Sequence, residues 1–217
     1  MIISFSGIDS AGKTTQIDKL TAFLDAHKVK YTKRWSKARG TPGVELIKSF
    51  FRKDKGLGEA ELQANRKQIY KSTKKQRLLY IASLLDLCWY WGVYFRYLNW
   101  THQVLICDRY LWDTYVEMKH DFYSIDIDKS ILWKLVKVFA VKPAISFVFI
   151  IPAELSLKRD IEKGTNGTED IDRKKSKIAL YMHLVMQKKW SHVMDGTKTR
   201  EMLHQEVLNI IDLVHGN

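Results

Sequence analysis

A glycine-rich segment near the start of the chain carries residues suited to holding phosphate groups. Residues 7–14 read Gly-Ile-Asp-Ser-Ala-Gly-Lys-Thr and match the pattern G-x-x-x-x-G-K-[ST] in full. The glycines of this pattern let the backbone wrap around phosphates, the lysine reaches the β- and γ-phosphates, and the threonine ligates magnesium. The motif therefore predicts a site for a nucleoside triphosphate with Mg²⁺. We expect its contacts to come from Gly7, Asp9, Ser10, Ala11, Gly12, Lys13, Thr14 and Thr15.

A second candidate site lies where the apolar run at residues 104–107 ends in Asp108, Arg109 and Tyr110. A carboxylate at a strand terminus near phosphates can help to hold magnesium or act as a base, and a guanidinium can make two hydrogen bonds to a phosphate. Taken alone, an Asp-Arg pair after a strand is more typical of a structural ion pair. Because this chain also carries the phosphate-binding motif, we expect Asp108 to join Thr14 at the metal and Arg109 to bind a phosphate.

The elements that must position these residues alternate along the chain. Apolar runs typical of strands occupy residues 2–6, 29–35, 104–107, 145–151 and 192–194. Patterns typical of helices occupy residues 12–26, 43–52, 59–98 with at least one break, 111–120, 129–139, 153–163, 172–190 and 200–215. The alternation predicts an α/β fold with a mostly parallel central sheet of about five strands and helices on both faces. Ligands of such folds bind beyond the C-terminal ends of the strands.

Length and composition describe one compact domain, and the charge is concentrated in one stretch. The 217 residues are 46% hydrophobic with 3 Pro and 11 Gly, which excludes disordered and low-complexity classes. Residues 27–77 hold 16 Lys or Arg against 4 Asp or Glu, a surplus equal to the whole net charge of +12. Such a surplus attracts nucleic acid, an anionic membrane surface or phosphorylated small molecules, or it simply forms a solvated face.

The cysteines and the apolar segments favour an intracellular protein. Cys88 and Cys107 lie in apolar surroundings without metal-ligand spacing, so we expect reduced core residues. No secretory signal is recognisable at the N-terminus, so we expect a cytoplasmic location. Residues 78–100 are long and apolar enough for a membrane span, but Asp86 and Arg96 interrupt them. We therefore expect a buried central helix, with one face available for a homodimer interface, rather than a membrane segment.

Six segments taken together resemble the thymidylate kinase family in order and spacing. They read GIDSAGKTTQ from residue 7, RGTP from 39, LLYIAS from 78, CDRY from 107, PAELSLKR from 152 and IDRKKS from 171. The likeness covers nearly the whole chain, and the first and fourth segments are its most specific parts. It implies a P-loop kinase fold in a single domain over residues 1–217, with an acceptor-binding region at about 35–100 and a mobile lid at about 160–175.

The resemblance also implies an activity and its partners. We expect a nucleoside monophosphate kinase that uses Mg²⁺ and transfers the γ-phosphoryl group of ATP to a pyrimidine monophosphate such as dTMP. A homodimer is implied by analogy with the family, whereas neither nucleic acid nor a membrane is expected as a partner.

Individual roles follow from matching positions of the family motifs. Asp9 matches an acid that contacts the acceptor sugar or orients its phosphate, and Tyr80 matches the aromatic that stacks on the acceptor base. Arg109, with Tyr110 beside it, matches the arginine that grips the acceptor phosphate, and Arg39 is a further candidate ligand of that phosphate.

The cation that assists phosphoryl transfer is implied to come from the lid. Some family members keep a basic residue inside the phosphate loop, where this chain has Ser10. The lid-side candidates are Arg159, Lys163, Arg173 and Lys174. Arg173 is the best match for the catalytic cation, which makes the expected catalytic set Lys13, Asp9, Arg109 and Arg173. Arg159 is expected to contact ATP.

One position departs from the family pattern and keeps two alternatives open. Leu84 stands where an arginine commonly helps to fix the base, and its apolar side chain removes a hydrogen-bond donor. The first alternative is a kinase of the same fold that acts on a nucleoside or another polar metabolite. The second is a nucleotide-binding module without turnover, whose basic stretch docks on polyanions.

Overall fold

The computed structural model describes residues 1–35, 73–101, 104–164 and 169–215. These residues form two compact units. Unit 1 comprises Met1–Trp35, Leu98–Val116 and Lys142–Asn217, and unit 2 comprises Ser36–Tyr97 and Glu117–Val141. Several expectations lie outside the described residues, namely the helix at 43–52, Arg39, most of the basic stretch 27–77, and residues 165–168 of the lid.

Unit 1 is built on a five-stranded sheet. Its strands are β1 (Ile2–Gly7), β2 (Tyr31–Trp35), β3 (Val104–Asp108), β4 (Ile145–Ile150) and β5 (His192–Asp195). They pair in the order β2-β3-β1-β4-β5, and every pair is parallel. All residues of β1 are buried, as expected for a central strand whose two faces are both covered. The expected α/β class and the strand number are confirmed.

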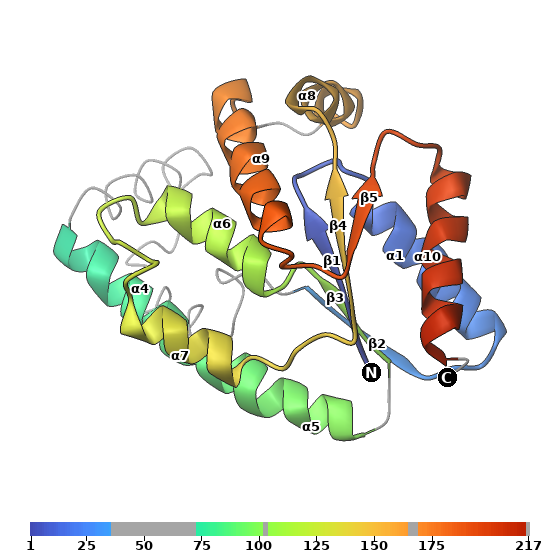
Figure 1. The fold of residues 1–217 in the computed structure, drawn as a ribbon, viewed down its shortest axis with the longest axis horizontal. Coiled ribbons are helices and arrows are strands. Elements are labelled where there is room, and N and C mark those ends of the chain that lie inside the picture. Colours follow the sequence, from blue (N-terminus) through green and yellow to red (C-terminus); the bar gives the residue numbers. More distant parts are fainter. Residues whose placement is uncertain (36–72, 102–103, 165–168, 216–217) are drawn as a thin grey trace, which may run out of the picture. The chain divides into compact units, whose positions relative to one another are not determined.

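Helices flank this sheet on opposite sides. Those of unit 1 are α1 (Lys13–Ala26), α8 (Ala153–Glu162), α9 (Ile171–Met186) and α10 (Arg200–His215). Figure 1 shows α1 and α10 on one side of the strands and α9 on the other. The chain leaves β1 toward β2 on one side of it and leaves the neighbouring β4 toward β5 on the other, so the loop after β1 lies at the switch point where ligands bind in such sheets.

Unit 2 is helical in the part that the structure describes. It contains α4 (Thr73–Trp89), a π-helical turn η1 (Tyr90–Tyr94), the start of α5 (Phe95–Trp100), and α7 (Ile131–Phe139), while α6 (Leu111–Asp121) runs from unit 1 into unit 2. The described helix runs without a break over residues 76–100, and the expected interruption corresponds there only to a change of hydrogen-bond pattern at the π-helical turn. This turn contains Gly92, where a Cβ atom would lie only 3.2 Å from Cβ of Phe139. Glycine thus lets α7 pack closely against this turn.

The long helix of unit 2 has two unlike faces. Its buried side chains include Tyr80, Leu84, Leu87, Trp91 and Phe95. Its exposed apolar side chains, here called the apolar stripe, are Leu78, Ile81, Leu85, Trp89, Val93 and Tyr97. By length and composition the helix Gln76–Trp100 could cross a membrane, although buried core helices of other proteins pass the same test. The expected burial therefore holds for one face of the helix only.

Candidate active site

The phosphate-binding loop follows β1 directly, and two glycines allow its shape. Gly7 has φ +132°, and a Cβ atom there would lie 2.4 Å from the carbonyl oxygen of Phe149 in β4. Gly12 has φ +95° and immediately precedes α1, whose first residue is Lys13. Glycine adopts these positive φ values without strain. They let the loop fold back so that its backbone N–H groups lie at the N-terminus of α1. This arrangement suits an anion at the N-terminus of α1.

Lys13 is buried at the centre of this loop. Its Nζ donates hydrogen bonds to the carbonyl oxygens of Gly7 at 2.9 Å and Ile8 at 2.5 Å. Burial, followed by the neighbouring Arg109, lowers the pKa of Lys13 from the ordinary 10.5 to about 7. A phosphate group placed in the loop would favour the charged form of this amine.

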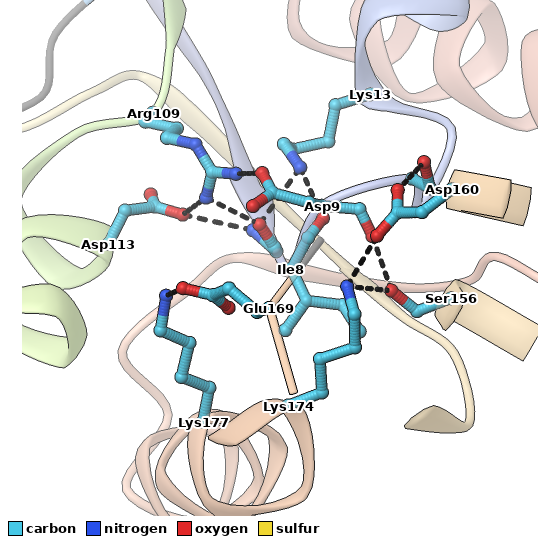
Figure 2. A network of polar contacts seen from close by, with 12 residues as sticks. Ile8, Asp9, Lys13, Arg109, Asp113, Ser156, Asp160, Glu169, Lys174 and Lys177 are labelled. Carbon is cyan, nitrogen blue, oxygen red and sulfur yellow. Dashed lines mark hydrogen bonds and ion pairs between the residues drawn. The ribbon is translucent and has the colours of Figure 1, made fainter. Parts of the chain in front are cut away.

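Asp108 and Arg109 reach the same edge of the sheet from β3. Phe5 of β1 pairs with Asp108, so the ends of these two strands lie side by side. Burial raises the pKa of Asp108, against the opposing effects of Lys13 and Arg109. Arg109 is 3% exposed, donates from Nη1 to the carbonyl oxygen of Gly7 at 2.7 Å, and forms an ion pair with Asp9 (Figure 2).

Two of the four described non-glycine residues with positive φ lie in this site, and the other two, Lys28 and Lys188, follow the ends of α1 and α9. Arg109 has φ 72° and Ser10 has φ 56°, and both residues carry side chains. Such conformations cost free energy and persist where the surrounding structure holds them, which is common at functional sites.

Asp113 organises this cluster, although sequence reasoning missed it. This fully buried carboxylate accepts hydrogen bonds from Ser6 Oγ at 2.5 Å, the Gly7 amide at 3.0 Å, the Tyr110 amide at 3.1 Å and Tyr181 Oη at 2.7 Å, and it lies 3.5 Å from Arg109 Nη1. The one available signal was its opposite charge four residues after Arg109, within the helix expected from residue 111.

A second polar cluster joins the phosphate-binding loop to α8 and α9 (Figure 2). Ser10 Oγ donates to Asp160 Oδ1 at 2.5 Å, and Ser156 Oγ donates to the carbonyl oxygen of Asp9 at 2.8 Å. Lys174 Nζ, from α9, donates to Ser156 Oγ at 3.0 Å and to Asp160 Oδ2 at 2.6 Å. The outer turn of the loop is therefore held by side chains from two helices.

The remaining lid-side candidates have different surroundings. Arg159 Nη1 lies 3.3 Å from the carbonyl oxygen of Ser10 and 3.1 Å from that of Gly196, so it links the loop to the segment after β5. Lys163 Nζ donates to Ser10 Oγ at 3.1 Å. Arg173 Nε lies 3.1 Å from Glu169 Oε1, and its side chain is 41% exposed.

The acceptor-side candidates divide between the two units. Tyr110 is buried in unit 1 and donates its amide to Asp113. Tyr80 is buried in unit 2, where its ring packs edge-on against Phe122 with centroids 5.4 Å apart. Leu84 lies one turn further along α4 and is fully buried.

The oxygen ligands that the site offers to a metal suit magnesium. Within the described residues, no three His, Cys, Asp or Glu side chains gather as a metal site. Magnesium does not require such a cluster, because it keeps several waters and binds through one or two protein oxygens together with substrate phosphates. The exposed hydroxyl of Thr14 and the carboxylate of Asp108 are oxygen ligands of this kind.

Comparison with protein-family models matches almost the whole chain. The matching family is described as thymidylate kinase, and the match covers residues 5–207. It begins within β1 and ends within α10, so it includes both polar clusters. The resemblance found in six short segments is confirmed.

Proposed function

Because the chain belongs to the thymidylate kinase family and is therefore a phosphotransferase, a nucleoside monophosphate kinase, we propose that its acceptor is a pyrimidine monophosphate such as dTMP. One observation supports a phosphorylated acceptor. Lys13 in the phosphate-binding loop and Arg109 directly after β3, the neighbour of β1 in the sheet, are both buried basic side chains at the same edge of the sheet. Two separate buried cations suit a reaction in which one phosphate group is passed to another.

The donor side is assigned to the phosphate-binding loop. Lys13 and the loop amides hold the β- and γ-phosphates of ATP, and the Arg159 guanidinium contacts the nucleotide from its place between the loop and Gly196. Thr14 and Asp108 would hold Mg²⁺, which would supply positive charge that neutralises the transferred phosphates. Phosphoryl transfer depends mainly on such positioning and charge neutralisation.

The acceptor side is assigned to Arg109, with Asp9 and Tyr110 beside it. The guanidinium is already held in place by Asp9 and Gly7, so little side-chain freedom is lost when it binds the acceptor phosphate. Arg39 is a further ligand in this proposal. Arg173 assists the transferred phosphoryl group from the lid at 160–175, whose closure would exclude water.

Recognition of the acceptor base is assigned to Tyr80. The burial of Leu84 supports stacking and shape, rather than a charged hydrogen bond, as the means of selecting the base. The same residue favours the second candidate, a kinase whose acceptor is a nucleoside or another polar metabolite. A hydrophobic pocket discriminates less sharply than one that hydrogen-bonds the substrate, so the acceptor range should be broad.

A coupled assay of ADP release tests the acceptor. The common nucleoside monophosphates and nucleosides are screened with ATP and Mg²⁺, and Lys13→Ala serves as the inactive control. We expect turnover with pyrimidine monophosphates that is lost in Lys13→Ala and on chelation of the metal. Product from nucleosides alone would select the second candidate. Persistent turnover by a folded Lys13→Ala protein would contradict the donor-site assignment.

We further propose a cytoplasmic homodimer that pairs through the apolar stripe of unit 2. Several large exposed apolar side chains on one helix face suit burial against an identical face. Sedimentation velocity should show a dimer for the wild type and a monomer for Trp89→Glu. The control is Met186→Glu, an apolar position on α9 that is more exposed than Trp89 (80% against 55%) and whose substitution should leave the dimer intact. Binding of the wild type to anionic vesicles or to oligonucleotides at physiological salt would argue instead for a membrane or a polyanion as partner.

A further inference from the structure

The outer turn of the phosphate-binding loop is held by a chain of contacts that ends at one buried lysine. Ser156 contacts the backbone of Asp9, and Asp160 contacts the side chain of Ser10. Lys174 Nζ lies within hydrogen-bond distance of both of these side chains, at 3.0 Å from Ser156 Oγ and 2.6 Å from Asp160 Oδ2 (Figure 2). Lys174 therefore couples α9 to the outer turn of the loop.

Lys174 supplies a buried positive charge opposite Asp160 in this chain of contacts. Asp160 is 6% exposed and Lys174 is 1% exposed, so water screens neither group well. Without the lysine, Asp160 would lose this buried counter-charge and would place a negative charge beside a loop that receives a triphosphate. Such a charge would repel the ligand and would also be costly to bury.

Neighbouring basic residues of α9 do not share this arrangement. Lys175 pairs with Glu154 of α8 at 3.2 Å, and both side chains are more than half exposed. Arg173 lies 3.1 Å from Glu169. Lys175 and Glu154 thus provide an ion pair between the same two helices that is separate from the loop.

We propose that Lys174 is a positioning residue for ATP binding. It neutralises Asp160 and, through Asp160 and Ser156, fixes the turn at Asp9 and Ser10 in the shape that accepts phosphates. It does not touch the transferred phosphoryl group. The proposal rests on ATP binding at the loop and is independent of which acceptor the enzyme uses.

Binding of the non-hydrolysable analogue β,γ-imido-ATP, measured by calorimetry without acceptor, tests the proposal. Lys174→Met should raise the dissociation constant about tenfold, because it removes the buried counter-charge of Asp160 beside the loop. The double variant Lys174→Met with Asp160→Asn removes both charges and keeps an oxygen that accepts from Ser10. Its dissociation constant should return to within about threefold of the wild type. Lys175→Met, the matched control, should bind as the wild type does.

Steady-state kinetics separate positioning from catalysis. In the double variant, kcat at saturating ATP should stay within about threefold of the wild type, because Lys174 acts on binding and not on the transition state. A large loss of kcat in this variant would show that Lys174 serves the transferred phosphoryl group and would overturn the proposal. Wild-type affinity in Lys174→Met would overturn it too, as would weak binding by a folded double variant.

If Lys174→Met fails to fold, Asp160→Asn and the double variant still decide the matter. Asp160→Asn leaves an uncompensated positive charge near the loop, so it should bind the analogue as tightly as the wild type or more tightly. Weaker binding by folded Asp160→Asn would contradict the role of charge balance. Because no acceptor is present in the binding measurements, their outcome cannot be confused with a wrong assignment of the acceptor.

Discussion

Asp113 is the carboxylate around which the candidate site is arranged. It accepts hydrogen bonds from β1, from Tyr110 and from Tyr181 of α9, and it is fully buried. Asp113→Asn replaces one acceptor oxygen by an N–H donor that faces other donors. We expect the free energy of unfolding to fall by about 2–4 kcal/mol, because hydrogen bonds to charged groups are strong and unpaired buried donors are costly. Urea unfolding without ligand measures this change.

Asp126→Asn is the matched control for this substitution. Asp126 pairs with Lys129 at 3.3 Å, and both side chains are at least half exposed. Its loss should change the free energy of unfolding by less than about 1 kcal/mol. An equal effect of the two substitutions would contradict the role assigned to Asp113.

The buried amine of Lys13 should make stability depend on pH. Its pKa is about 7 in the folded protein and near the ordinary 10.5 in the unfolded chain. Between these values the unfolded chain binds more protons, so the contribution of Lys13 to the free energy of unfolding rises with pH, by up to about 1.4 kcal/mol per pH unit. Urea unfolding from pH 6 to pH 9 should therefore favour the wild type progressively over Lys13→Met. Parallel curves for the two proteins would rule out the shifted pKa.

Some residues of the site were predictable from the sequence and others were not. Lys13 and Arg109 were found because each belongs to a short motif whose chemistry depends on local spacing. Asp160 was not found, because its partner Ser10 lies 150 residues away and the contact exists only after β1 and β4 pair. Asp113 was missed for the same reason, since Ser6 and Tyr181 reach it from distant parts of the chain.

At the scale of elements, the close approach of β1 to β4 requires Gly7. A Cβ atom there would overlap the carbonyl oxygen of Phe149 at 2.4 Å, whereas nothing lies within 4 Å of a Cβ atom at Gly12. Gly7→Ala should therefore lower the free energy of unfolding by about 3 kcal/mol or more, through overlap added to strain. Gly12→Ala carries only the strain of its positive φ and should cost about 1–2 kcal/mol. Thermal or urea unfolding compares the two, and equal losses would contradict the steric argument.

Periodicity predicted the strands of the sheet and most of the described helices, but not the details of the helices. The apolar runs of β1 and β4 gave clear signals because both faces of these strands are buried. The π-helical turn at Tyr90–Tyr94 was expected only as a break, because its form depends on the packing of Phe139 against Gly92. The helix expected to reach residue 190 ends at Met186, and the next residues lead into β5.

At the scale of the whole molecule, the phosphate-binding machinery described here belongs to unit 1. That unit contains the loop after β1, the C-terminal end of β3, and the side chains of Ser156, Asp160 and Lys174 that contact the loop or one another. Tyr80 and the apolar stripe belong to unit 2. Binding of ATP should therefore stabilise unit 1 more than unit 2.

Hydrogen exchange followed by mass spectrometry can test this division. At about 100 times its dissociation constant, β,γ-imido-ATP adds about 2.7 kcal/mol to the stability of any state that binds it. Local openings that break the loop or its contacts with α8 and α9 should become rarer, so exchange at residues 7–14, 153–162 and 171–186 should slow. Openings confined to α7 leave the loop intact, so exchange at residues 131–139 should change little. Uniform slowing of exchange across both units would show instead that the molecule opens only as a whole. In either case, Lys13→Met should lose the protection that the nucleotide gives.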